Sequence, residues 1–242
     1  MTVPTQPAGA LLDAAARAPY LGLEDLAGQS VMIVAPHPDD ETFGCGMALA
    51  SAAAAGTAIC LVLLTRGEAS HPGSLEYPTR RLARLRLGEL RAALDMLAPG
   101  QTVPVLSLDL PDGCCGPGDI TQAVRRRTIG FAQDHEIDTV WTTWGGDPHC
   151  DHTVAALLGA DIADALDARL RTFPVWGRFG NAVPAELGRF HDSRFQQRKA
   201  DAAACYRSQL GLVVTDAPAG FVMPPAIYDH FVTAPEIFIR ER

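Results

Sequence analysis

Short apolar runs alternate with longer amphipathic segments along most of the chain. A short apolar run bounded by proline or glycine is typical of a buried strand, whereas apolar residues three or four positions apart are typical of a helix. The segment 79–97 is the clearest helix, because its leucines and alanines form one stripe at helical spacing. This pattern predicts strands over 30–36, 57–65, 103–110, 138–144 and 171–176, and helices over 10–17, 43–55, 79–97, 119–134, 151–169 and 193–209.

The predicted strands and helices alternate, and this order is typical of an α/β fold with a mostly parallel sheet and right-handed crossovers. Beyond Gly177 the pattern weakens, although a last strand is expected over 227–232. The chain shows no internal repeat and no low-complexity linker. We therefore predict a single domain over residues 1–242, with a lead-in at 1–28, a core at 29–177 and an extension at 178–242 that closes the fold.

Composition narrows the classes of function. The chain is 48% hydrophobic and 20% charged, which is ordinary for a protein with a sizeable core. Its net charge of -8 argues against binding to nucleic acid or to an anionic membrane surface. The six cysteines include no CxxC pair, and the N-terminal residues do not look like a signal peptide, so reduced thiols in a cytoplasmic protein are expected.

One uncharged stretch, residues 46–65, has about the length of a membrane-spanning helix. Its first half is mostly alanine, its second half is rich in leucine, isoleucine and valine, and Gly56 and Thr57 divide them. This division favours a helix followed by a buried strand, so no integral membrane span is predicted.

Two polar loops follow predicted strands. They contain seven residues that could bind a metal or move a proton: His37, Asp39, Asp40 and Glu41 in the first loop, and His149, Asp151 and His152 in the second. In open α/β sheets, ligands bind at the carboxyl ends of the strands, so the two loops are expected to face each other there. Two histidines and one carboxylate with an open position are typical of catalytic Zn²⁺, and Fe²⁺ would suit the same ligands.

Two other interpretations of these loops are weaker. An Asp-Asp pair after a first strand also occurs in magnesium sites, but those sites use oxygen ligands, and His37 and His152 favour a softer ion. Asp151 could instead only cap a helix while residues 39–41 form a solvated turn. That structural interpretation explains one loop but not both.

The sequence His37-Pro38-Asp39-Asp40-Glu41 after one strand, with His149-x-Asp151-His152 after a later one, resembles the PIG-L/LmbE-like zinc N-deacetylases. The resemblance covers residues 29–240 and implies a Rossmann-like three-layer sandwich. Weaker parts of it are Thr65-Arg66-Gly67-Glu68, Arg86-x-x-Glu89, the group Lys199, Tyr206, Ser208 and Gln209, and Pro235-Glu236-x-Phe238. Two positions depart from the family pattern: Cys150 stands where proline is usual, and Met47 where a second glycine is common.

The resemblance also implies a role for each residue of the site. The metal ligands would be His37, Asp40 and His152; the general base would be Asp39; the partner of the reacting carbonyl would be His149; and a substrate contact would be Arg86. Arg66 and Glu68, in the polar turn after the second strand, are further candidate substrate contacts. A bound zinc ion lowers the pKa of its water from about 16 to about 7, and a carboxylate such as Asp39 then takes the proton. We expect Asp151 to hold His149 in its tautomer and to raise its pKa.

The predicted function is removal of an acetyl group from an N-acetylated amino sugar or its glycoside by zinc-dependent hydrolysis. The expected partner is therefore a small N-acyl amino sugar, and the oligomeric state, including a homo-oligomer, stays open. One alternative is a zinc amidase that acts on a larger acyl amide conjugate. A second is a metal-binding protein without turnover, against which the presence of Asp39 argues.

Overall fold

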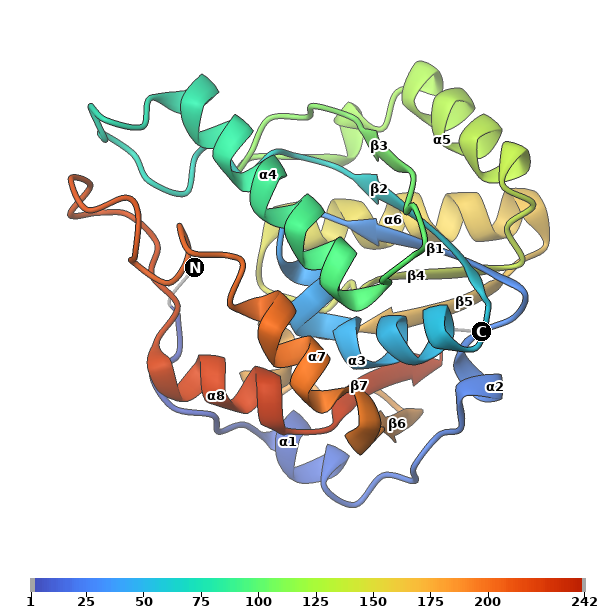
Figure 1. The fold of residues 1–242 in the computed structure, drawn as a ribbon. Helices are drawn as coiled ribbons and strands as arrows, with labels where there is room; N and C mark the ends of the chain where they lie inside the picture. The colour runs from blue at the N-terminus through green and yellow to red at the C-terminus, as the bar shows by residue number, and fades with distance from the viewer. Residues whose placement is uncertain (1–2, 241–242) are drawn as a thin grey trace.

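The computed structural model describes residues 3–240 and contains one twisted sheet (Figure 1). Residues 1–2 and 241–242, which the single-domain prediction also covers, lie outside the described residues. Within the described part, the sheet has seven strands in the order β3-β2-β1-β4-β5-β7-β6. Their bounds are β1 Ser30–Ala35, β2 Ala58–Leu63, β3 Val105–Ser107, β4 Thr139–Thr143, β5 Arg169–Phe173, β6 Leu187–Phe190 and β7 Glu236–Arg240. Strands β1 to β5 are parallel, while β7 pairs antiparallel with both β5 and β6. The predicted α/β fold with a mostly parallel sheet is confirmed.

Helices cover both faces of the sheet and make three layers (Figure 1). One core contains residues of α3 (Asp40–Ala54), α4 (Thr79–Leu97), α7 (Ser193–Ala203) and α8 (Pro225–Thr233), and the other contains residues of α5 (Gln122–Asp134) and α6 (Cys150–Leu166). Strand β1 shows why both faces are covered: Val31 and Ile33 enter the first core, and Met32 and Val34 the second. Alternate side chains of a strand point to opposite faces, so an all-apolar strand needs a layer on each side.

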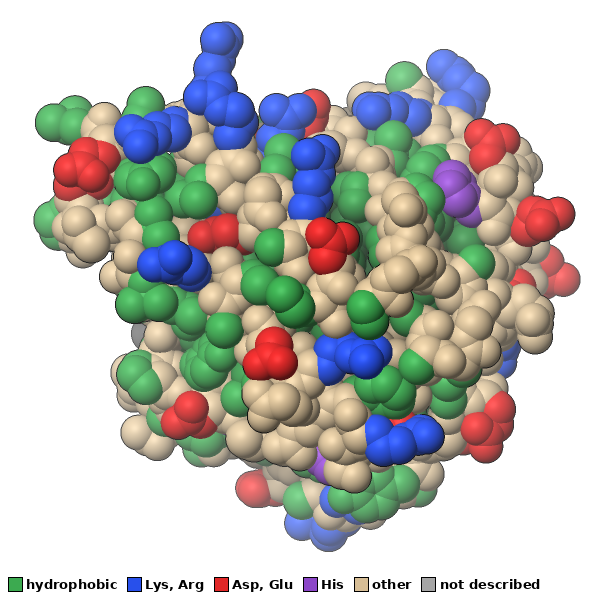
Figure 2. Space-filling model, viewed as in Figure 1, with side chains coloured by type: hydrophobic (Ala, Val, Ile, Leu, Met, Phe, Trp, Pro, Cys, Tyr) green, Lys and Arg blue, Asp and Glu red, His purple; other side chains and the backbone are tan. Residues whose placement is uncertain are grey.

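The remaining elements are short. They are the helices α1 (Ala10–Ala15) and α2 (Leu23–Leu26) and the 3₁₀ turns η1 (Pro117–Asp119) and η2 (Gly177–Phe179). Within residues 3–240, no helix is both long enough and apolar enough to cross a membrane. On the face shown in Figure 2, basic and acidic side chains are interspersed.

The C-terminal part differs from the sequence prediction. The segment 227–232 was expected to be a strand, but it lies within helix α8, and the last strand is β7. Ile227 and Phe231 are four positions apart and both buried, a helical spacing, and Pro225 starts the helix with its fixed φ. Strand β6 was not predicted, and β5 begins and ends earlier than the expected 171–176.

Helix α3 bends at Cys45, whose φ of -142° and ψ of 21° are not helical. A regular helix would join the Phe43 carbonyl to the Met47 N–H. Here Lys199 Nζ donates to the Phe43 oxygen at 3.0 Å, and Glu236 accepts from the Met47 nitrogen at 2.6 Å. Lys199 and Glu236 also pair directly at 2.7 Å with no exposed side-chain surface, and we call them the core ion pair. The core ion pair thus stabilises the bend in α3. The bend separates the first turn of the helix, which carries the acidic motif, from the rest of the helix.

Candidate metal centre and active site

The two polar loops leave neighbouring strands at the same edge of the sheet. Strands β1 and β4 are parallel and adjacent, with Val34 opposite Thr142. The strand order reverses direction between them, and this switch point is where α/β folds bind ligands. The predicted meeting of the His37 loop and the His149 loop is therefore confirmed.

Three side chains, His37, Asp40 and His152, form a candidate donor set for a metal. Their donor atoms all lie within 4.8 Å of one another. Asp40 Oδ2 lies 3.1 Å from His37 Nδ1 and 3.5 Å from His152 Nε2. His152 is completely buried, and within the described residues its Nε2 makes no hydrogen bond. A buried nitrogen without a partner is costly, and a metal ion would satisfy it.

A second candidate set, His37, His149 and Asp151, shares one histidine with the first. Its atoms already have partners. Asp151 accepts from the Gly113 and Cys115 backbone nitrogens at 2.8 and 2.9 Å, and His149 Nδ1 accepts from the Asp151 nitrogen at 3.2 Å. The first set is therefore the better fit to a metal.

The charge around His37 also fits a cation. Its Nε2 lies 2.9 Å from Asp151 Oδ2 and 3.2 Å from Asp112 Oδ1, while its Nδ1 contacts Asp40. Burial disfavours the charged ring, but the bonds from Asp112, Asp151 and Asp40 outweigh it and raise the pKa of His37 well above its usual value. Metal and proton compete for such a nitrogen, and a divalent ion would offset the excess of carboxylates.

The charge of Asp151 acts to raise the pKa of His149, as expected, but the Asp151 carboxylate does not hold the ring through a hydrogen bond. The Asp151 carboxylate binds His37 and two backbone N–H groups of the loop after β3, and only the Asp151 backbone contacts His149. Burial, followed by the neighbouring charges of His37 and His152, lowers the pKa of His149 to about 4. His149 is thus a neutral ring near pH 7, because these effects outweigh the opposing charge of Asp151.

Asp39 lies beside the donor set in a strained backbone conformation. Its φ of 134° is rare for any residue other than glycine. Glu41 accepts from the Asp39 nitrogen at 3.1 Å, and Arg86 Nη2 donates to Asp39 Oδ2 at 2.9 Å. Burial, only partly opposed by Arg86, raises the pKa of Asp39 well above its usual value.

Arg86 is almost completely buried, and it donates hydrogen bonds to other groups of the protein. Besides Asp39 it donates to the Pro38 and Gly67 carbonyl oxygens at 2.8 and 2.9 Å. Gly67 has a φ of +66°, and a Cβ there would lie 1.8 Å from Arg86 Nη1, so only glycine fits. Arg86 also lines the cavity at the site, so the predicted substrate contact remains a proposal.

Arg66 and Glu68 are not among the described residues that line this cavity. Arg66 pairs with Asp109 near the surface, and Glu68 accepts from the Arg66 backbone nitrogen at 3.1 Å. The structure therefore does not bring these two side chains to the metal donors. Cys150 belongs to neither donor set, although its sulfur lies 3.2 Å from Asp151 Oδ1 and 3.5 Å from the Gly113 oxygen.

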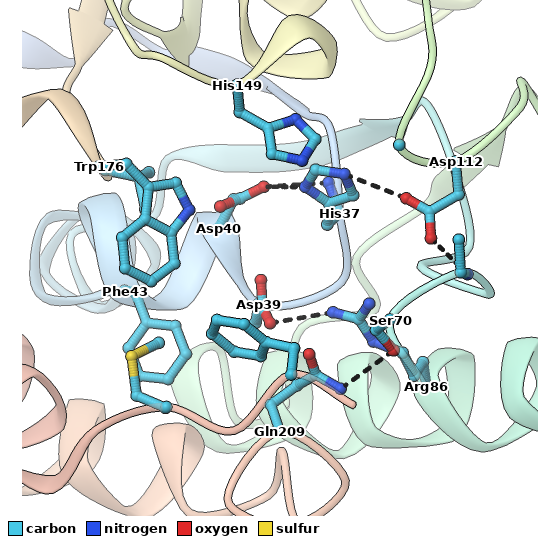
Figure 3. A pocket seen from close by; sticks show the side chains of 15 residues that line it. His37, Asp39, Asp40, Phe43, Ser70, Arg86, Asp112, His149, Trp176 and Gln209 are labelled. Atoms are coloured by element: carbon cyan, nitrogen blue, oxygen red, sulfur yellow. Dashed lines mark hydrogen bonds and ion pairs between the residues drawn. The ribbon is translucent and has the colours of Figure 1, made fainter. Parts of the chain in front are cut away.

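The cavity above the donor set has a volume of about 160 Å³ and two unlike walls (Figure 3). Figure 3 shows Trp176 and Phe43 on one side and Arg86 and Ser70 on the other. The apolar wall consists of Phe43, Val175, Trp176, Phe221 and Met223, and the polar lining includes His37, Asp39, Asp40, Ser70, Arg86, Asp112, His149 and Gln209.

Several cavity residues were not predicted from the sequence. Asp112 follows strand β3 and Trp176 follows β5, so both could have been found by the rule that polar and ligand-binding groups gather after parallel strands. Phe221 and Met223 come from a loop without a periodic pattern, and no local signal marks them.

The family description PIG-L, GlcNAc-PI de-N-acetylase, matches residues 32–163, more than half of the chain. The chain belongs to the PIG-L family of de-N-acetylases, as the two motifs suggested. The match includes both polar loops and the residues of the candidate donor set. Comparison with curated proteins finds no match.

Solved structures of similar fold include N,N′-diacetylchitobiose deacetylase from Pyrococcus horikoshii, which is 17% identical with a TM-score of 0.62 over 82% of this chain and 76% of that one. The A40926 pseudoaglycone deacetylase Dbv21 is 19% identical with a TM-score of 0.64 over 87% and 96%. GalB, the 4-carboxy-2-hydroxymuconate hydratase from Pseudomonas putida KT2440, is 20% identical with a TM-score of 0.63 over 76% and 80%. At these identities the likeness establishes the fold, and the hydratase shows that the fold alone does not determine the reaction.

Proposed function

We propose that the protein is a zinc-dependent N-deacetylase that removes an acetyl group from an N-acetylated amino sugar or its glycoside. The observation that carries this proposal is the donor set His37, Asp40 and His152, with an unpartnered buried nitrogen, directly beside Asp39 in a cavity. When bound there, zinc would polarise a carbonyl oxygen and make hydroxide available at neutral pH. Membership of a de-N-acetylase family supports an N-acetyl group as the target.

Asp39 is the proposed general base. Arg86 holds Oδ2 of Asp39 at 2.9 Å, which leaves the second carboxylate oxygen to accept a proton from the attacking water. Asp39 is not part of the favoured donor set, so its carboxylate is not needed as a metal ligand and can act as a base. We further propose that Asp39 passes this proton to the leaving amine, because His149 carries no spare proton near pH 7.

His149 is the proposed hydrogen-bond donor to the oxyanion. Its Nδ1 accepts the Asp151 N–H at 3.2 Å, so the neutral ring carries its hydrogen on Nε2. A fixed donor of this kind stabilises negative charge that develops on the reacting carbonyl oxygen. A neutral ring also avoids placing a second cation next to the metal.

The two walls of the cavity suit one face of a sugar each. Trp176 offers an aromatic surface, and the opposite side presents hydroxyl, amide, carboxylate and guanidinium groups from Ser70, Gln209, Asp112 and Arg86. Binding sites of this kind combine an apolar surface with a few polar groups that fix orientation. The small volume implies that the cavity holds the acetamido end of a substrate, with the remainder outside.

The first experiment is metal analysis of the purified protein combined with acetate release from a panel of N-acetylglucosamine derivatives. About one zinc per chain together with acetate release is the expected result. Zinc binding with release of longer acyl groups, but no acetate, would favour the amidase alternative. Failure to bind metal after reconstitution with zinc or ferrous iron would contradict the proposed donor set.

A further inference from the structure

The carboxylate of Asp147, in the loop after β4, lies between the metal donors and the apolar wall. Its side chain is fully buried. Asp147 Oδ2 accepts from His152 Nδ1 at 2.8 Å and from the Val175 nitrogen at 3.0 Å. It also lies 3.3 Å from the Trp176 nitrogen, and Oδ1 accepts from the Gly177 nitrogen at 2.5 Å. One carboxylate thus holds both a metal ligand and the backbone of the segment 175–177.

We propose that Asp147 is a positioning residue that couples metal binding at His152 to the position of Trp176 in the substrate-binding wall. This inference rests on the proposed function only in requiring that His37, Asp40 and His152 hold a metal. His152 donates its Nδ1 hydrogen to Asp147, so the Nε2 lone pair is free for a metal. Carboxylates that fix a histidine tautomer in this way strengthen metal binding.

The coupling follows from the sharing of one acceptor. A metal on Nε2 makes the Nδ1 hydrogen of His152 a stronger donor, and the bond to Asp147 then becomes shorter and stronger. Because the same Oδ2 accepts from the Val175 nitrogen, the position of the carboxylate also determines where the backbone of Val175 and Trp176 lies in the apolar wall. Coupling between two sites is reciprocal, so a change that displaces the wall must also lower the affinity of the site for zinc.

Gly177 makes the coupling testable away from the ligands. A Cβ at Gly177 would lie 2.3 Å from Asp147 Oδ1 and 2.9 Å from the Trp144 ring, so Gly177→Ala must shift the carboxylate or the wall. Gly145 provides a matched control in the neighbouring loop. A Cβ there would make only an ordinary contact with Ala156 Cβ at 3.6 Å.

The first readout is zinc affinity, measured by competition with a chromophoric chelator. Gly177→Ala is expected to bind zinc about tenfold more weakly although it removes no ligand, and Gly145→Ala should match the wild type. Wild-type zinc affinity in a folded Gly177→Ala protein would overturn the coupling.

The second readout is the ¹⁹F spectrum of protein labelled with 5-fluorotryptophan. The chain has three tryptophans, and Trp176→Phe identifies the resonance of Trp176. Zinc should shift that resonance in the wild type and in Gly145→Ala. A resonance that does not move when zinc binds to the wild type would overturn the proposal.

Asp147→Asn serves as a second variant if Gly177→Ala does not fold. An amide can donate to His152 Nδ1, which moves the ring hydrogen to Nε2 and blocks the metal, while its oxygen can still accept from Gly177. Zinc affinity should fall by about 10- to 100-fold, and saturating zinc should no longer shift Trp176. An Asp147→Asn protein that keeps both properties would overturn the coupling. Absence of zinc binding by the wild type would overturn the metal site as well, whereas coupling without acetate release would contradict only the proposed reaction.

Discussion

Two buried polar clusters flank the first turn of helix α3, and their groups are satisfied to different degrees. In the core ion pair, Lys199 and Glu236 have opposite charges 2.7 Å apart, and each also binds backbone groups at the bend. On the other side, the carboxylates of Asp39 and Asp40 are adjacent, the backbone of Asp39 is strained, and Nε2 of His152 makes no hydrogen bond among the described residues.

The difference separates a structural role from a functional one. Buried polar groups are normally paired, and departures from that rule are concentrated where a ligand or a reaction completes the arrangement. The core ion pair is complete without any ligand, so it serves to shape α3. In the cluster of His37, Asp39, Asp40 and His152, a buried nitrogen lacks a hydrogen bond, which is the arrangement expected of a ligand-binding site. Substitutions in the two clusters should therefore separate activity from stability.

The largest expected effect is on activity, from Asp39→Asn. The amide keeps the size of the side chain but cannot take a proton, so acetate release should fall by about 10²- to 10⁴-fold. Zinc content should stay at the wild-type level. The free energy of unfolding in urea should change by less than in Lys199→Met, because loss of the charge paired with Arg86 is offset by removal of a like charge beside Asp40, and the amide oxygen can still accept from Arg86. Wild-type turnover would contradict the role of Asp39 as general base. Loss of zinc would mean that Asp39 also supports metal binding.

The next largest effect is on stability, from Lys199→Met. The change leaves Glu236 buried without its cation, and removal of one partner from a buried ion pair costs about 3–5 kcal/mol. Urea unfolding measures this loss, while the folded fraction should keep the wild-type KM. The double variant with Glu236→Gln is the control and should recover part of the stability. A Lys199→Met protein of wild-type stability would show that the pair is not structural.

Most of the fold could be predicted because its signals are local. Strands β1 and β2 are almost wholly apolar, β4 consists of β-branched and aromatic residues, and α4 carries its apolar stripe at helical spacing. The prediction of a strand over 227–232 was wrong because a short apolar run suits a strand or a buried helix equally well. Strand β6 has only four residues and includes Gly188, so its pairing with β7 depends on tertiary contacts.

The site was predictable as far as residue types and strand ends could determine it. The meeting of two loops after β1 and β4 follows from parallel topology, but side-chain directions do not. The sequence predicts that the Asp151 side chain holds His149, yet residues two apart at a helix start do not face each other. Besides His37, Asp151 binds the backbone of Gly113 and Cys115, and besides His152, Asp147 binds the backbone of residues 175–177. No local pattern joins these backbone segments to the motif.

A smaller effect concerns pH and stability near the core ion pair. Burial, with the charges of Arg178 and Lys199, lowers the pKa of His230 to about 4, below the usual 6.5. Between these values the unfolded chain binds more protons, so this contribution is complete above pH 6.5 and is lost as the pH falls toward 4. The full shift corresponds to about 3 kcal/mol, and partial exposure of the ring reduces the expectation to about 1–2 kcal/mol.

His230→Phe is the test, because its ring can keep the contacts with Phe179 and Phe231 but cannot titrate. Urea unfolding of both proteins is measured from pH 7.5 to 4 in the same metal state. Other groups of the protein also titrate in this range, so the difference between the two curves is the quantity of interest. The wild type should lose more stability than the variant as the pH falls, and parallel curves would contradict this contribution.

The smallest expected effect is on substrate binding, from Trp176→Phe. The indole lines the cavity and packs edge-on against Phe221 and Phe231, with ring centroids 5.9 and 6.2 Å apart. Phenylalanine keeps an aromatic surface but offers less of it, so KM should rise by about 2- to 5-fold, within the energy of one aromatic contact, while kcat stays unchanged. Zinc affinity should also be unchanged, because Asp147 contacts the backbone of residue 176 and not its ring. A fall in zinc affinity would instead mean that the Trp176 ring itself supports the proposed metal ligands. The apolar wall would then stabilise the metal site as well as contact the substrate.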